Sequence, residues 1–177
     1  MSNPSNGSPA GPGDEPAGRT VVPAYHEVDP FHRALHHVAP AGLDPETAQS
    51  SGMRRLAAIS GKSVGARKLW MGQTLVSPSM ASANHHHGES ETAIYIVSGR
   101  PEFVFLEGEG DEAREVRVRT APGDYIFVPP WVPHREENPD PNLEAVVVIA
   151  RSTQEAVVVN LPDLRWAGPV LTTGTGT

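Results

Sequence analysis

Residues 85–99 read HHHGESETAIYIVSG, and residues 123–138 read GDYIFVPPWVPHREEN. Each segment combines histidine with a short run of β-branched and aromatic residues, which is typical of a strand in a buried sheet. Residues two apart on a strand project from one face, so His85 and His87 point together while His86 points away. Two histidines at this spacing suit a single metal ion, which His134 and a nearby carboxylate would complete while leaving room for water or substrate.

The surrounding sequence is rich in short strand-like segments separated by Gly, Pro, Asn and Asp. Seven such segments lie at 67–76, 91–98, 102–108, 114–121, 125–130, 144–152 and 155–161. No long helical pattern intervenes, which favours an antiparallel sandwich or barrel. The run AVVVIA at 145–150 is apolar at both parities, so we expect a second sheet, the N-terminal arm or another subunit to cover both faces. A homodimer is expected on that ground.

Both segments carry a family resemblance. His85-x-His87-x-x-x-Glu91 followed by Gly99 resembles the first cupin motif, and the second motif is matched by Gly123, Pro129, His134 and Asn138. The resemblance covers residues 66–160. It implies an all-β fold, a double-stranded β-helix or jelly-roll barrel, here with an N-terminal arm and one short helix. It also implies one divalent metal ion per chain (Fe, Zn, Ni or Mn) inside the barrel, with the ligands His85, His87, Glu91 and His134.

Two departures from the motifs affect this ligand set. Seven residues separate Glu91 from Gly99 where the family usually has six, so a register fixed by Gly99 turns Thr92 inward instead of Glu91. Either a bulge restores Glu91, or Glu89 reaches back from the loop, or the site consists of three histidines and water; we favour Glu91. In the second motif, Trp131 stands where the family usually has Gly, although neighbouring prolines can shape that turn.

Candidates for substrate chemistry are fewer. Tyr95 and Tyr125 lie on predicted strands and carry hydroxyl groups that could serve a substrate, and Glu89 is a further candidate. Most other aromatic residues of the barrel are expected to fill its core. His86 is expected to lie at the surface or beside the ligands rather than on the metal.

Composition limits the class of protein. The chain has 177 residues, a formal net charge of −7 and no cysteine. The acidic balance argues against binding of nucleic acid or anionic membranes, and the lack of cysteine excludes disulfides and thiolate metal sites. Neither a long apolar span nor a signal-peptide pattern is present, so we expect a cytoplasmic protein.

The domain organisation is simple. We expect a disordered leader at 1–20, because this Pro, Gly and Ser-rich segment has almost no aliphatic side chains. An arm with a short helix follows at 21–65, then the barrel at 66–160 and a tail at 161–177. The helix is predicted near 44–51, DPETAQSS, where Asp44 can cap the first turn.

The fold does not settle the function, because cupin barrels host many activities. A full set of ligand types favours a metalloenzyme acting on a small molecule, with oxygenase-type chemistry slightly ahead of isomerase or lyase chemistry. The alternative is a non-catalytic module in which the metal anchors a small ligand. The resemblance is to small stand-alone cupins of bacteria, and it names no substrate.

Overall fold

The structure is a computed structural model that describes residues 35–50, 52–108, 110–153, 157–164 and 171–173. The predicted leader at 1–20 lies outside these residues, as do parts of the predicted arm and tail. No helix in the described ranges is long and apolar enough to cross a membrane.

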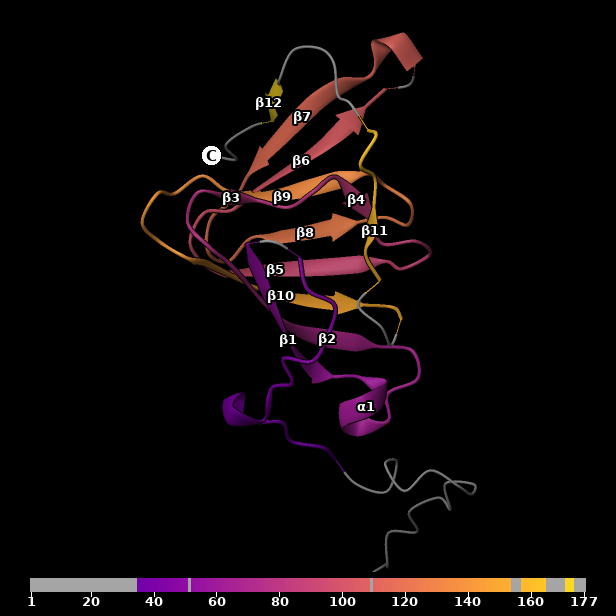
Figure 1. The fold of residues 1–177 in the computed structure, drawn as a ribbon, viewed down its shortest axis with the longest axis vertical. Helices are drawn as coiled ribbons and strands as arrows, with labels where there is room; N and C mark the ends of the chain where they lie inside the picture. The colour runs from indigo at the N-terminus through magenta and orange to yellow at the C-terminus, as the bar shows by residue number, and fades with distance from the viewer. Residues whose placement is uncertain (1–34, 51, 109, 154–156, 165–170, 174–177) are drawn as a thin grey trace, which may run out of the picture.

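The chain folds into two β-sheets, as predicted (Figure 1). Sheet A has five antiparallel strands in the order β1-β2-β10-β5-β8. Its strands are β1 (Met53–Ile59), β2 (Trp70–Val76), β5 (Thr92–Ser98), β8 (Tyr125–Val128) and β10 (Ala145–Arg151). Sheet A therefore begins before residue 66, the predicted start of the barrel, because β1 pairs with β2.

Sheet B follows the order β11-β4-β9-β6-β7-β12, and β3 pairs with β9 beside this path. Its strands are β3 (Met80–Ala81), β4 (His85–His86), β6 (Glu102–Glu107), β7 (Arg114–Arg119), β9 (His134–Asn138), β11 (Val159–Asn160) and β12 (Leu171–Thr173). All of its pairings are antiparallel except that of β12 with β7. Among the described residues, the two 3-10 turns Pro40–Gly42 and Gly110–Glu112 lie outside the sheets.

The apolar core joins the two sheets. Ile94 and Ile96 of β5 and Ile149 of β10 are almost fully buried and belong to one cluster with Phe103 of β6. The outer face of β10 is half-buried, and Val148 lines a hollow together with arm residues such as Val38 and Leu43. The arm therefore supplies part of the second cover that the apolar run 145–150 requires.

The part of the chain that the structure describes contains one short α-helix, but it does not lie where the sequence predicted it. Helix α1 spans Gly61–Val64 and begins at Ser60, whose side chain accepts a hydrogen bond from the backbone N–H of Ser63 in a capping box. The segment 44–50 is irregular instead. Asp44 Oδ1 does accept a backbone N–H, that of Glu46, but the backbone of Asp44 pairs with Ala57 of β1, and this pairing replaces the helix.

Two left-handed backbone positions shape the turns that flank the site. Gly99, between β5 and β6, has φ +79°, and a Cβ there would lie 2.7 Å from the Cα of Ala145. Trp131, at the position where the motif usually has glycine, has φ +64°. This is the left-handed conformation that glycine adopts most easily. The backbone N–H of Trp131 donates to the carbonyl of Gly88, which ties the turn before His134 to the turn after His87.

The outer face of sheet B carries a network of ion pairs across three strands. Arg117 on β7 pairs with Glu102 on β6 and with Glu137 on β9. Arg135 on β9 pairs with Glu115 on β7 at 2.9 Å and with Glu137 at 2.5 Å. These five side chains, two arginines and three glutamates, are largely shielded from solvent.

Candidate metal centre

Strand pairing brings three histidines together inside the barrel. His85 on β4 and His134 at the start of β9 are direct cross-strand partners, and His87 follows two residues after His85 on the same face. Their potential ligand atoms all lie within 4.8 Å of one another, and no side chain of the three is more than 3% exposed. The structure therefore unites the three histidines predicted from the motifs.

Each ring is held through Nδ1 and directs Nε2 to a common point. The Nδ1–H groups of His85 and His134 donate to the carbonyls of Ala83 and Val132, both at 2.9 Å. The Nδ1 of His87 lies 2.8 Å from the hydroxyl of Thr92. A neutral imidazole that donates through Nδ1 keeps an unprotonated lone pair on Nε2, which is the arrangement that outer hydrogen bonds impose on metal-binding histidines.

Burial keeps these rings neutral. Desolvation, followed by the charge of His134, lowers the pKa of His85 to about 4. Desolvation is also the main cause that lowers the pKa values of His87 and His134, and Arg151 lowers the pKa of His87 further. All three histidines are therefore unprotonated at neutral pH, the state that metal binding requires.

These residues fit a divalent ion. The Nε2 atoms of His85 and His87 lie 3.2 Å apart, and the buried Nε2 of His134 has no hydrogen-bond partner in the described part of the chain. Lone pairs that face one another are stabilised by a cation between them, and 3.2 Å is compatible with two nitrogens that each lie about 2.1 Å from one ion. Imidazole nitrogen suits zinc, iron and nickel, so the donor set alone does not select the metal.

Three buried charged residues surround the histidines, and sequence reasoning missed them. Arg151 at the end of β10 is 1% exposed; its Nη2 lies 3.1 Å from Nε2 of His87, and its Nη1 donates to the carbonyl of Val157. Glu136 is 2% exposed and Arg55 is 1% exposed. Glu136 lies two residues after His134 on one strand, so parity alone could have placed it inside.

The predicted carboxylate ligands do not join the histidine group. Glu91 and Glu89 are both exposed, whereas Thr92 is fully buried and bonded to His87. The register is the one in which Gly99 turns Thr92 inward: Thr92 begins β5, and the backbone of Glu91 accepts from Ser152 on the neighbouring loop. Among the alternatives raised by the sequence, this geometry matches the site with three histidines.

The candidate tyrosines and His86 lie away from the group. Tyr95 and Tyr125 are 38% and 78% exposed, and their rings contact one another at a centroid distance of 4.9 Å. His86 is half-buried; its Nδ1 accepts the backbone N–H of Gly88, and its ring lies 5.4 Å from that of Trp131. The outward position of His86 is the one that strand parity predicts.

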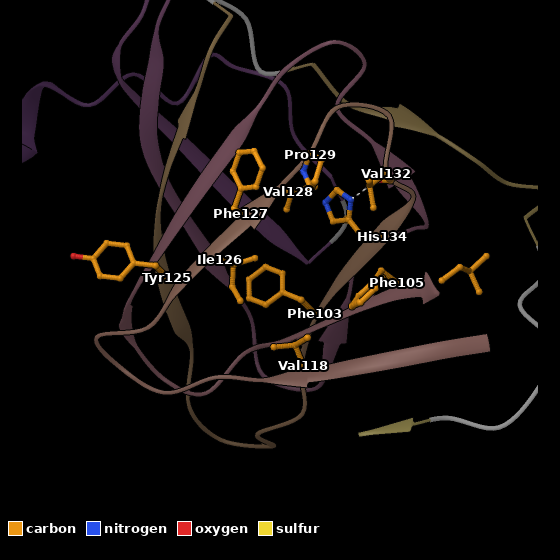
Figure 2. A pocket seen from close by; sticks show the side chains of 11 residues that line it. Phe103, Phe105, Val118, Tyr125, Ile126, Phe127, Val128, Pro129, Val132 and His134 are labelled. Atoms are coloured by element: carbon orange, nitrogen blue, oxygen red, sulfur yellow. Dashed lines mark hydrogen bonds between the residues drawn. The ribbon is translucent and has the colours of Figure 1, made fainter. Parts of the chain in front are cut away.

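An apolar pocket leads to the histidines between the two sheets. Its volume is about 420 Å³, and its walls come from β8 with the loop that follows it and from β6 and β7 of sheet B (Figure 2). Phe103, Phe105 and Ile126 line it, and His134 is the only lining residue that belongs to the histidine group. Tyr125 and Phe127 are exposed and His134 is buried, so the pocket runs from the surface to the centre.

Fold and site together define a two-sheet jelly roll that encloses a three-histidine centre. Residues 73–150 match the family described as Cupin domain. The chain therefore contains a cupin domain, as the two motifs indicated. Comparison with curated proteins gives no match.

Several solved structures share the fold. An oxalate oxidase in complex with glycolate is 14% identical with a TM-score of 0.54, over 65% of this chain and 59% of that chain. The polyketide cyclase RemF from Streptomyces resistomycificus is 21% identical with a TM-score of 0.57, over 72% of this chain and 86% of that chain. Peruvianin-I, a cysteine peptidase from Thevetia peruviana latex, is 15% identical with a TM-score of 0.58, over 78% and 82% of the two chains.

These likenesses concern the fold alone. The chain spans about three-fifths of the length of the oxalate oxidase structure. An oxidase, a cyclase and a peptidase share one scaffold here, so the activity has to be argued from the site.

Proposed function

We propose that this protein is a metal-dependent cupin enzyme that acts on a small molecule, with one divalent ion held by His85, His87 and His134. The convergence of three unprotonated Nε2 atoms in a buried site carries this proposal. A bound ion would supply Lewis-acid chemistry or, in the case of iron, chemistry with molecular oxygen.

The residues of the chain supply position and exclusion of water. Hydrogen bonds to Ala83, Val132 and Thr92 fix the orientation of the three rings. The walls of the pocket are apolar, and His134 lies at its inner end. A ligand that fills the pocket therefore brings one of its ends to the histidines. Arg151, whose Nη2 lies 3.1 Å from Nε2 of His87, places a positive charge beside the histidines.

Oxygenase-type chemistry is favoured slightly over isomerase or lyase chemistry. The latter reactions need a general base within reach of the substrate. The pocket lining contains no carboxylate or lysine among the described residues, and the hydroxyl of its one tyrosine, Tyr125, lies at the exposed end. Glu136 is buried but is not part of the lining.

Elemental analysis of protein prepared without an affinity tag tests the metal site. We expect about one equivalent of a transition metal per chain, lost in His87→Ala and in His134→Ala. His86→Ala is the matched control and retains it, because His86 faces away from the group. Glu91→Gln and Glu89→Gln are also expected to retain it. Metal loss in His86→Ala alone would refute the ligand assignment.

Measurement of oxygen uptake by the iron-loaded protein then distinguishes an enzyme from a protein that only binds a ligand. With a substrate that binds in the pocket, we expect oxygen consumption that stops when His134 is replaced. Product formation without oxygen uptake would support isomerase or lyase chemistry. Binding without any turnover would support the alternative, a cupin that holds a small ligand through its metal.

A further inference from the structure

The pocket that leads to His134 defines the class of molecule the site can take. Its walls are made by side chains from both sheets, and Phe103 and Phe105 give it aromatic surface. Figure 2 shows the Phe103 ring between Tyr125 on one side and His134 on the other. Side chains with hydrogen-bonding groups are limited to Tyr125 and His134 within this lining.

The size of the pocket excludes a very small ligand as the best fit. About 420 Å³ lies within the range of about 300–1,000 Å³ that is usual for drug-sized ligands. A two-carbon dicarboxylate would leave the phenylalanine walls in contact with water. A ring system would bury those walls and could stack on them.

The inner end of the pocket has the opposite character. His85 and His87 lie next to His134 in space, and the buried guanidinium of Arg151 lies 3.1 Å from Nε2 of His87. The Nε2 of His134, which lines the pocket, is buried and has no hydrogen-bond partner in the described ranges. A hydroxyl or enol group of a ligand is therefore favoured at this end.

From these two ends we infer that the site takes an apolar, multi-ring molecule that carries a hydroxyl or enol group at one end, with the rings between β8 and β6–β7 and the oxygen at the histidines. This inference deepens the proposed function, because it names the substrate class of the same site. It separates this chain from the oxalate oxidase that shares its fold, since oxalate has no apolar part to fill the pocket.

Ligand binding tests the inference without any need for turnover. The probes are 2-naphthol, 2-methylnaphthalene and oxalate, titrated into the purified, metal-loaded protein by calorimetry. We expect 2-naphthol to bind at least tenfold more tightly than oxalate, and more tightly than 2-methylnaphthalene. Oxalate binding that equals or exceeds that of 2-naphthol would overturn the apolar part of the inference. Equal binding of the two naphthalenes would overturn the hydroxyl part.

Variants locate the bound rings. Phe105, the cross-strand partner of His134, lines the pocket, and Phe105→Ala should weaken 2-naphthol binding about tenfold while metal content stays the same. Val97→Ala is the matched control: Val97 is 44% exposed on β5 outside the pocket lining, and its replacement should leave binding unchanged. Ile126→Ala, in the pocket lining on β8, provides a second pocket variant if Phe105→Ala does not fold. Unchanged affinity in a folded pocket variant would overturn the placement.

The two proposals can fail separately. If metal is present and 2-naphthol does not bind, the substrate class is wrong while the metal centre stands. If 2-naphthol binds through the pocket but no metal is held, the metal-dependent function is wrong while the ligand class stands.

Discussion

The metal-free protein should lose stability as pH falls, because its buried histidines cannot take up protons without penalty. The pKa of His85 is lowered to about 4 in the folded chain, whereas an unfolded histidine titrates near about 6.5. Between these two values the unfolded state binds more protons, so the free energy of unfolding falls as pH falls. From pH 7.5 to pH 5.0, His85 alone accounts for a loss of about 2 kcal/mol. The lowered pKa values of His87 and His134 act in the same direction.

Urea unfolding in the presence of a chelator, at pH 7.5 and at pH 5.0, measures this loss. His85→Gln removes one titrating ring, so the loss between the two pH values should be about 2 kcal/mol smaller in the variant than in the parent chain. Such a difference is a large fraction of the total stability of a domain. An equal loss in both proteins would mean that His85 is not buried as a neutral ring, and the geometry of the centre would then be wrong.

Two further outcomes follow from contacts beside the site. Thr92→Val removes the partner of His87 Nδ1 and should weaken metal binding about 10–100-fold in a competition assay with a chelator, with little change in melting temperature. Unchanged affinity would show that Thr92 does not orient the ring. Gly99→Ala places a methyl group against Ala145 at a left-handed position, so its thermal unfolding should show a loss of about 1–3 kcal/mol. A variant as stable as the parent chain would contradict that close approach.

Local patterns in the sequence were enough to predict the two sheets and the three histidines. Each of the seven predicted strand segments contains one whole strand, the last of them the two-residue β11. Strand parity placed His85 and His87 on one face, and the second motif supplied His134. These inferences need only short-range alternation and motif spacing, which a single sequence displays.

Features that depend on distant strands could not be predicted in this way. Strand β1 was not predicted from the sequence, because its inward-facing residues include Arg55. This charged residue interrupts the apolar alternation of Met53 and Ala57. Arg151 lies inside because His87 and Val157 accept its hydrogen bonds, and neither contact is visible in local sequence. Whether Glu91 or Thr92 points into the barrel depends on a shift of one residue in strand register. The motif spacing indicated this shift but did not decide it.

The ion pairs on the outer face of sheet B have a consequence for the centre on the other side. β4 and β9 share a single pair of facing residues, His85 and His134, so this short pairing alone aligns the two histidines poorly. Sliding β9 by one residue would turn Arg135 and Glu137 into the buried interior, and sliding it by two would separate them from their partners on β7. The ion pairs of Arg135 and Glu137, which do not contact the histidines, thus help to determine which residue of β9 faces β4. In this way the outer face of sheet B sets the alignment of the candidate metal ligands.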